Sequence, residues 1–356
     1  MYKLRRYGSG PIFSPQAGLS WENEGVFNPG VTKFGDEIYL LYRAVGETEA
    51  YISYFGLAKS SDGINFKRVS TEPVFRPMEF FDKWGVEDPR ITKIDDDYYV
   101  TYVAVSKRIM EKGVSVKHFL PLETAAALLK TKDFLSFENL GIISSPSSDN
   151  KNTCLFPRLI NGRYYKLHRP NYWSQEWFNS PYEKYISEGL PCDVRDLPKI
   201  PSIWIASSVD LKNWTNHKLL ISPTHQFAAK IGPGLPPIET KDGWLLIYHH
   251  VVKEEATNRL TYSARAALLD LDNPERLIAN LDYDILAPEM PYELERETKI
   301  VFPTGGYVSG DTLHIYYGSS DRYICLATGS LSELLVELKK TILEVPQPNI
   351  YETNKQ

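Results

Sequence analysis

Five segments of this chain repeat one pattern of apolar and polar positions. Each begins at a residue followed by proline, and an apolar run rich in aromatic residues comes next. The five openings are Asn28-Pro29, Asp88-Pro89, Phe156-Pro157, Pro236-Pro237 and Phe302-Pro303. The runs occupy residues 38–43, 98–103, 164–169, 244–249 and 313–318. Aromatic and β-branched residues are typical of β-strands, so the pattern predicts strands at both places in every repeat.

The ends of the five runs carry most of the polar exceptions. Their last residues are Arg43, Val103, Arg169, His249 and Gly318. Equivalent places of a structural repeat occupy equivalent places in the fold, so we expect these ends to meet at one mouth. The pattern therefore predicts a scaffold that directs polar groups to a single site.

A second signature, built around an aspartate, follows each run. In the first three repeats an aromatic residue stands four positions after the aspartate: Asp62 and Phe66, Asp133 and Phe137, Asp210 and Trp214. Aspartate tolerates tight turns and bonds the backbone that follows it. We therefore expect a hairpin at each aspartate, with the aromatic ring covering the strands.

Each repeat thus predicts about four short strands. Units that must stack to bury their faces form radial arrays, which close without long free edges. We expect an all-β fold, a five-bladed β-propeller with a short C-terminal helix, forming one catalytic domain over residues 1–356. An open pair of β-sandwich sheets is the alternative. The helix is expected at about 330–344, with Ser330 as its cap and Leu331, Leu334, Leu335 and Leu338 on one face.

Two long segments, residues 105–124 and 170–200, interrupt the repeats. Long loops of compact folds are often lids or binding walls. The second segment is rich in aromatic side chains that suit stacking on sugar rings: Tyr172, Trp173, Trp177, Phe178, Tyr182 and Tyr185. We expect it to contact a sugar, and packing on a neighbouring blade or subunit is the alternative.

Composition narrows the class of partner. The net charge of -5 and the pI near 5.9 give no electrostatic reason to expect nucleic acid or an anionic membrane. No run approaches the roughly 20 apolar residues of a membrane span. The basic start has no apolar segment behind it, so we expect a cytoplasmic protein. The three cysteines, Cys154, Cys192 and Cys325, are expected to be buried free thiols.

Asp88 is the strongest candidate for chemistry. It stands in the sequence VEDPR (86–90), where the following proline restricts its backbone to extended geometry. A carboxyl fixed at a strand entrance could donate a proton to a glycosidic oxygen. The alternative is an aspartate that bonds backbone amides in a turn, but its alignment with Asn28 and Arg158 in the repeats favours the catalytic interpretation.

Several cations occur at equivalent or adjacent positions of otherwise apolar segments. They are Arg43, Arg158, Arg169, Lys230 and His249. Cations around one mouth with few matching acids indicate an anion site, and Arg matches phosphate oxygens well. Separate structural pairs with Glu87, Asp95 or Glu239 are the alternative. The histidines show no HxxxH or HxH spacing, so we expect no metal.

Taken together, these segments resemble glycoside hydrolase family 130, five-bladed propeller enzymes that phosphorolyse or hydrolyse β-mannosides. The motifs that carry the resemblance include FNPGV (27–31), LLYRAVG (40–46), VEDPRI (86–91), LFPRLINGRYYKLHRP (155–170), KIGPGLPPIETKDGWLLIYHHV (230–251) and IYYGSSD (315–321). They run in order through nearly the whole chain.

The resemblance implies roles for individual residues. Asp88 would be the catalytic acid, relaying its proton through the mannose 3-hydroxyl. Phosphate would then attack the anomeric carbon and invert it to α-mannose 1-phosphate. The phosphate-binding residues would be Arg158, Arg169, Lys230 and His249, and the sugar-binding residues would be Asn28, Arg43 and Asp321. No cofactor is implied; the partners are a β-mannoside oligosaccharide and inorganic phosphate, and a homo-oligomer is left open.

Departures from the family pattern keep two other interpretations open. His250 follows His249 where the family has glycine, Leu159 replaces a basic residue, and the 170–200 insertion resembles the branch of β-1,2-mannosidases. An inverting β-1,2-mannosidase needs a base that activates water, and the sources would be Glu87, Glu239 or Glu289. A propeller that binds carbohydrate without catalysis is the second alternative. Arg158 is basic where an acid would favour water, so phosphorolysis is the preferred prediction.

Overall fold

The computed structural model describes residues 1–46, 51–106, 124–144, 148–173, 200–224 and 227–342. Within them the fold is all-β with one short α-helix, which confirms the predicted class. No helix in these ranges has the length and apolar character needed to cross a bilayer. Most of the 105–124 segment and most of the 170–200 segment lie outside the described residues. So do Cys192 and the side chains of all six aromatic residues noted in the second segment.

Three sheets have four antiparallel strands each, in chain order. The first holds β2 (Gly25–Phe34), β3 (Glu37–Val45), β4 (Ser53–Ser60) and β5 (Lys67–Arg68). The second holds β6 (Val86–Ile94), β7 (Asp97–Val105), β8 (Thr124–Thr131) and β9 (Glu138–Ile142). The third holds β10 (Ser148–Leu155), β11 (Tyr164–Trp173), β12 (Ile203–Ser208) and β13 (Trp214–Ile221).

The remaining strands form one nine-stranded sheet. One part holds β14 (Ala228–Pro233), β15 (Ile238–Thr240), β16 (Gly243–Lys253), β17 (Leu260–Leu269) and β18 (Leu277–Asn280). The other holds β19 (Lys299–Ser309), β20 (Thr312–Ser319), β21 (Tyr323–Ser330) and the N-terminal β1 (Arg5–Arg6). Among the described residues, the two parts are joined by the short parallel pairing Thr261↔Lys299 and Tyr262↔Ile300 alone. The sheet pairing thus gives four sheets rather than five separate ones.

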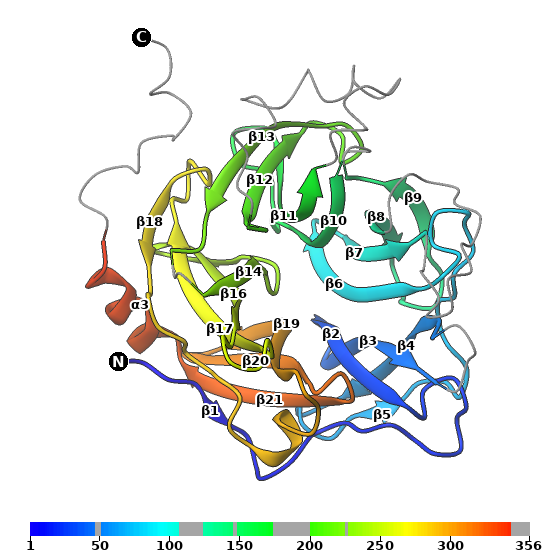
Figure 1. Ribbon diagram of the computed structural model, residues 1–356. Helices are drawn as coiled ribbons and strands as arrows, with labels where there is room; N and C mark the ends of the chain where they lie inside the picture. The colour runs from blue at the N-terminus through cyan, green and yellow to red at the C-terminus, as the bar shows by residue number, and fades with distance from the viewer. Residues whose placement is uncertain (47–50, 107–123, 145–147, 174–199, 225–226, 343–356) are drawn as a thin grey trace.

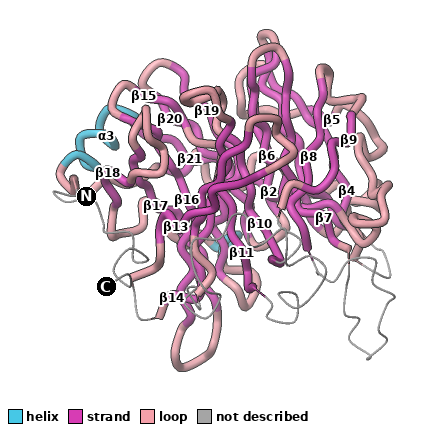
Figure 2. Tube along the Cα trace, turned by 90° about the horizontal axis from the view of Figure 1, so that it is seen from above, coloured by secondary structure: helices cyan, strands magenta, loops and turns pink. Residues whose placement is uncertain are grey.

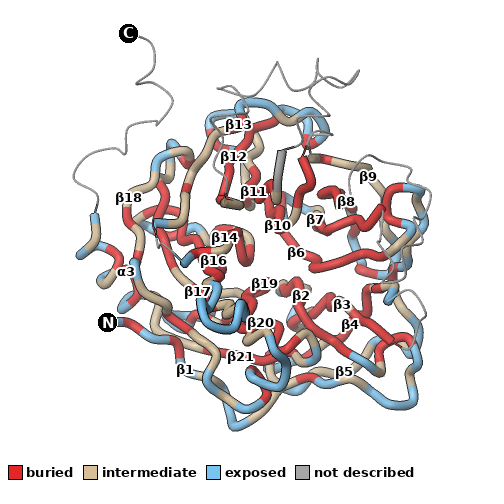
Figure 3. The backbone as a smooth tube through the Cα atoms, in the orientation of Figure 1, coloured by how far each residue is buried: buried red, intermediate tan, exposed pale blue. Residues whose placement is uncertain are grey.

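The sheets surround a central region, and Figure 1 shows β2, β6, β10, β14 and β19 nearest to it. Contacts between neighbouring sheets run through these inner strands, since β2 contacts both β6 and β19 and β10 contacts β14. Seen from above, strands make up most of the molecule and the helix lies at one edge (Figure 2). Buried residues concentrate on the strands, and exposed residues lie mostly on peripheral turns (Figure 3).

The predicted aspartate turns are confirmed. Asp62, Asp133 and Asp210 each accept hydrogen bonds from the backbone N–H groups two and three residues later, at 2.7–2.9 Å. Asp270 does the same in the degenerate fourth repeat. Hydrogen bonds to the ionised carboxylate lower the pKa of Asp62 and of Asp210. The aromatic partners of the first three aspartates pack on core clusters, as expected: Phe66, Phe137 and Trp214.

The C-terminal helix α3 spans Leu331–Lys339, which is shorter than predicted. Its predicted cap is confirmed because the Ser330 hydroxyl accepts the Glu333 N–H at 3.1 Å. The apolar face is buried through Leu334, Leu335 and Leu338, and Leu331 packs against the same cluster. Cys154 and Cys325 are buried free thiols, as predicted for these two cysteines.

A buried ion pair fastens the N-terminus to the last sheet. β1 pairs with β21, and the Arg6 guanidinium binds both carboxylate oxygens of Glu293 at 2.8 Å. Glu293 belongs to the 3₁₀ turn η2 (Pro291–Glu293) and also accepts the Tyr317 hydroxyl at 2.8 Å. Burial alone would raise the pKa of Glu293, but the Arg6 and backbone hydrogen bonds outweigh it and lower that pKa.

We predict that Glu293→Gln lowers the free energy of unfolding by about 3 kcal/mol, because it leaves Arg6 without its buried counter-charge. Chemical denaturation measures the loss. Since the pKa of Glu293 is depressed on folding, the contribution of this pair is full above the ordinary pKa of glutamate and is lost as pH falls through the folded value.

Glu289→Gln is the matched control. Glu289 contacts the same guanidinium at 3.1 Å, but its side chain is 77% exposed. Exposed pairs contribute less than about 1 kcal/mol. Equal losses in the two variants would contradict the anchoring role of Glu293.

Candidate active site

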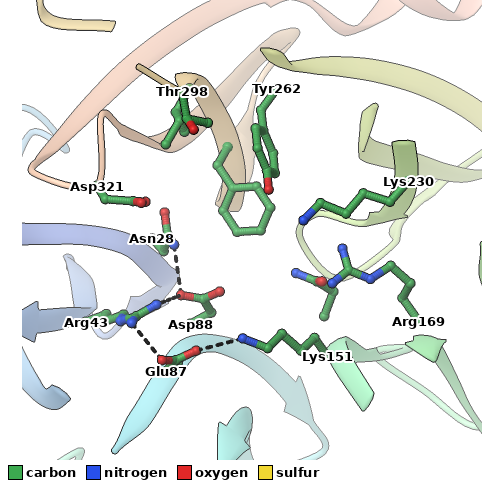
Figure 4. Close-up of a pocket in the computed structure, with 13 residues that line it drawn as sticks. Asn28, Arg43, Glu87, Asp88, Lys151, Arg169, Lys230, Tyr262, Thr298 and Asp321 are labelled. Atoms are coloured by element: carbon green, nitrogen blue, oxygen red, sulfur yellow. Dashed lines mark hydrogen bonds and ion pairs between the residues drawn. The ribbon is translucent and has the colours of Figure 1, made fainter. Parts of the chain in front are cut away.

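A cavity of about 270 Å³ gathers side chains from all parts of the fold. Its lining residues are Asn28 (β2), Arg43 (β3), Glu87 and Asp88 (β6), Lys151 and Asn152 (β10), Arg169 (β11), Lys230 (β14), Tyr262 (β17), Ile300 and Phe302 (β19), and Thr298 and Asp321 from loops. Figure 4 shows their arrangement. Segments far apart in the sequence therefore supply one polar site, as the repeat pattern predicted.

Three inner strands carry the same bulge at this site. In β2 the register passes from Phe27 to Gly30 while the partner strand advances by two residues, so Asn28 and Pro29 oppose a single residue. β6 does the same at Asp88, and β10 does so at Asn152. The first bulged residues have φ of 49°, 52° and 57°, a left-handed conformation that Asn and Asp tolerate better than most residues. The extended backbone expected for Asp88 before its proline is therefore wrong, because the bulge imposes the left-handed conformation. Bulges re-aim side chains, and here they direct an amide, a carboxyl and an amide into the cavity.

The register also confirms that the ends of the five runs are equivalent. Each end pairs with an inner-strand residue beside the centre: Phe27↔Arg43, Glu87↔Val103, Lys151↔Arg169, Gly232↔His249 and Phe302↔Gly318. At Gly318 a Cβ would stand 1.9 Å from Asn28 Oδ1, so that position must be glycine for Asn28 to occupy its place.

Asp88 is held by two donors on one oxygen. Asn28 Nδ2 donates to Asp88 Oδ1 at 2.8 Å, and Arg43 Nη1 reaches the same atom at 3.3 Å. Asp88 is 6% exposed. Figure 4 shows its second oxygen directed into the cavity. The geometry thus fixes the carboxyl while leaving one oxygen toward the space that a substrate would fill.

Glu87 links the two sides of the cavity. Its carboxylate accepts from Arg43 Nη2 at 2.7 Å and from Lys151 Nζ at 3.2 Å. Asp321 lies near the same arginine, at a φ of 47°. Loss of contact with water raises the pKa of Asp321; the charge of Arg43 opposes this rise, and that of Asp88 adds to it.

The opposite wall is positive. Arg169 donates to Asn171 Oδ1 at 2.7 Å, and its Nη1 stands 3.2 Å from His249 Nε2. Burial, opposed by neighbouring Tyr262 and reinforced by Arg90, lowers the pKa of Arg169 to about 10. Burial together with the charges of Arg169 and Lys151 lowers the pKa of Lys230 to about 7.

His249 lies behind Arg169 and does not line the cavity. An arginine can only donate, so His249 Nε2 must accept and the imidazole is neutral. Burial and the charge of Arg169 lower the pKa of His249 well below its usual range, which agrees with that state. His249 therefore orients the guanidinium that faces the cavity.

The structure corrects the prediction for Arg158. Its guanidinium forms a pair with Glu239 at 2.8–3.0 Å, its side chain is 42% exposed, and it does not line the cavity. This is the structural pairing that the sequence left as the alternative. The reason is the bulge, because the equivalent of Asp88 in the third repeat is Asn152, four positions before Phe156.

Sequence reasoning missed Lys151, Asn152, Tyr262, Thr298, Ile300 and Phe302 as lining residues. The third bulge lacks proline, so the pattern that marked Asn28 and Asp88 gives no signal at Asn152. Tyr262 comes from β17, a strand with no x-Pro step, and it pairs with Val251 of β16 and with Ile300 of β19. For Lys151 a signal exists: it stands 18 residues before Arg169, close to the spacing of Phe27 and Arg43.

The three glutamates considered as bases are separated. Glu87 lines the cavity, Glu239 pairs with Arg158, and Glu289 is exposed beside Arg6. In the described ranges no three His, Cys, Asp or Glu residues are grouped so as to hold a metal ion. The arrangement thus offers the carboxyl of Asp88, a second carboxylate (Glu87) bound by two cations, a third carboxyl (Asp321) near Arg43, and a positive wall.

Comparisons with known proteins agree on the family. The model of glycoside hydrolase family 130, described as β-1,4-mannooligosaccharide phosphorylase, matches residues 5–340. A 1,2-β-oligomannan phosphorylase of Thermoanaerobacter sp. (strain X514) is 34% identical, covering 94% of this chain and 99% of its own. A β-1,2-mannobiose phosphorylase of Listeria innocua is 36% identical, covering 81% and 69%.

A solved structure gives the same answer. The β-1,2-mannobiose phosphorylase from Listeria innocua, in complex with β-1,2-mannobiose, superposes with a TM-score of 0.74 at 28% identity. The match covers 95% of this chain and 99% of that one. The resemblance seen in the sequence is confirmed, and this chain belongs to glycoside hydrolase family 130.

Proposed function

We propose that this enzyme cleaves a β-mannosidic bond with inorganic phosphate, inverting the anomeric carbon to give α-mannose 1-phosphate. One observation carries the proposal: the cavity places the carboxyl of Asp88, held on one oxygen by Asn28, across from Arg169 and Lys230, for which the described residues offer no carboxylate at ion-pair distance. A sugar bound between these walls would meet a proton donor on one side and an anion on the other. The related phosphorylases support the same reaction.

Asp88 is the proposed general acid. It gives a proton to the leaving glycosidic oxygen, through the mannose 3-hydroxyl in the scheme implied by the family resemblance. The bond from that oxygen to the anomeric carbon breaks as a phosphate oxygen forms a bond on the opposite face. Phosphate is already a nucleophile, so it needs seating and no second carboxylate.

The proposed phosphate seat consists of Lys151, Arg169 and Lys230. Lys151 takes the place predicted for Arg158, and His249 acts by orienting Arg169. Guanidinium and ammonium donors make strong charge-assisted bonds to phosphate oxygens. Asn28, Arg43 and Asp321 are the proposed sugar-binding residues, and the rings of Tyr262 and Phe302 offer a sugar an apolar wall.

Hydrolysis is the less favoured reaction on this scaffold. An inverting hydrolase needs a carboxylate free to activate water. Of the three glutamates considered, Glu87 alone lines the cavity, and Arg43 and Lys151 already bind both of its oxygens. We propose β-1,2-linked mannose as the substrate, because two relatives that match over most of this chain are named for that linkage.

The remaining expectations stay proposals. We infer that the nine-stranded sheet corresponds to two blades, because in the described residues only two residue pairs join its halves, and that the whole chain forms one five-bladed propeller domain.

A cytoplasmic location is supported by the buried free thiols Cys154 and Cys325. Association into a homo-oligomer also stays a prediction.

We predict that β-1,2-mannobiose is cleaved only when phosphate is present, with α-mannose 1-phosphate and mannose as products. Product analysis by NMR, with and without phosphate, measures both dependence and anomeric configuration. Release of two mannose molecules at the same rate without phosphate would establish hydrolysis instead.

We predict that Asp88→Asn lowers kcat/KM by a factor on the order of 10³, because general acid catalysis is lost. Initial rates at saturating phosphate measure the loss. Asp95→Asn is the matched control: Asp95 lies in the same hairpin with a similar φ of 54°, but it is exposed and outside the cavity. If the activity of Asp88→Asn were close to that of Asp95→Asn, Asp88 would not be the general acid.

We predict that Lys151→Ala and Arg169→Ala each raise the KM for phosphate roughly 10- to 100-fold, since each removes a charge-assisted bond to the anion. Arg158→Ala should leave that KM within about twofold, because it breaks an exposed pair away from the cavity. Initial rates measured over a range of phosphate concentrations give the KM of each variant. A large rise in KM for Arg158→Ala alone would mean that Arg158 binds phosphate, as predicted from the sequence.

A further inference from the structure

The positive wall holds more charge than its surroundings balance. Lys151 has Glu87 at 3.2 Å, but among the residues that the structure describes Arg169 bonds the neutral side chains of His249 and Asn171 and no carboxylate. Lys230 has no carboxylate at ion-pair distance among the described residues; its Nζ stands 5.1 Å from the centre of the Tyr262 ring. Several ammonium and guanidinium groups in one cavity repel one another when no anion is present.

The groups that face Lys230 come from every neighbouring strand. Arg169 on β11 and Lys151 on β10 disfavour its charge, and Asp321 opposes them more weakly. His249 on β16 is neutral, and Tyr262 on β17 has a pKa raised to about 12 by burial, so it is neutral as well. The largest cause is burial itself, and the sum lowers the pKa of Lys230 to about 7.

In such a cluster of cations, lysine is the side chain that loses its proton most readily. An arginine keeps its proton in proteins, whereas a buried lysine changes its protonation readily. Lys151 forms an ion pair with Glu87 at 3.2 Å, and Lys230 has no such pair among the described residues. The repulsion is therefore relieved most easily by a neutral amine at Lys230.

We propose that Lys230 is largely neutral in the empty cavity above neutral pH and takes up a proton from solvent when a dianion binds beside Arg169. This inference rests on the proposed phosphate seat and goes beyond it. The anion supplies the missing counter-charge, so the protonated amine becomes favourable and forms a charge-assisted bond to it. Binding thus adds one dianion and one proton to the cavity, and dissociation releases both.

The affinity of the cavity for an anion should depend on pH. Below about pH 7 Lys230 already carries its proton, and this linkage is silent. Above that value the proton must come from solvent, so the anion affinity falls by up to about tenfold per pH unit. The fall ends at the higher pKa that Lys230 has in the complex.

Calorimetric titration with sulfate at pH 8 tests the proposal. Sulfate is a dianion that exchanges no proton with the buffer at this pH, unlike phosphate. Titrations in two buffers of different ionisation enthalpy give the number of protons taken up for each anion bound. We expect a clear uptake approaching one proton in the wild-type enzyme.

Lys230→Arg is the decisive variant because it keeps a cation that does not lose its proton. We expect it to bind sulfate with the uptake abolished. Lys253→Arg is the matched control, since Lys253 lies on the neighbouring strand β16 and is exposed; its uptake should equal that of the wild type. For a variant that fails to fold, the wild-type enzyme gives the second measurement: the KM for phosphate should rise from pH 7.5 to 9 more steeply than the titration of phosphate explains.

The outcomes separate this inference from the proposed function. Sulfate binding without proton uptake, or uptake that persists in Lys230→Arg, overturns the inference and leaves phosphorolysis standing. Phosphate-independent cleavage with no anion binding overturns both.

Discussion

A two-residue bulge, repeated in β2, β6 and β10, is the constraint on which the site depends. A regular strand would alternate its side chains between the two faces of the sheet and could not direct Asn28, Asp88 and Asn152 into the centre. The left-handed backbone at these positions costs little because the residues are Asn and Asp. The surrounding register then fixes which residues stand beside them, including Arg43 and Arg169.

The two sides of the cavity carry different charges. On the side of Asp88, Asn28 and Arg43 bind one oxygen of the carboxyl, and Arg43 with Lys151 binds Glu87, so Asp88 is held without being buried alone. On the side of Arg169 and Lys230 the described residues leave the positive charge unmatched. A sugar between a proton donor and an anion is what phosphorolysis requires. Burial, together with the same imbalance, lowers the pKa of Lys230 on this wall.

The sequence predicted the features that local chemistry determines. Repeated strands, aspartate turns and the Ser330 cap depend on nearby residues, and the matched ends Arg43, Arg169 and His249 follow from the repeat itself. The prediction for the third repeat was misaligned. Its bulge is Asn152-Thr153, which contains no proline, and the repeat was aligned on Pro157 instead. That one shift accounts for both the misplacement of Arg158 and the omission of Lys151. Tyr262 could not be found because a pairing between strands of different repeats brings it to the site.

A crystal structure of the enzyme with phosphate and β-1,2-mannobiose tests the central claim most directly. The account predicts an anion bound by Lys151, Arg169 and Lys230, on the face of the sugar opposite to Asp88. An anion bound at Arg158, or one on the same face as Asp88, would contradict it.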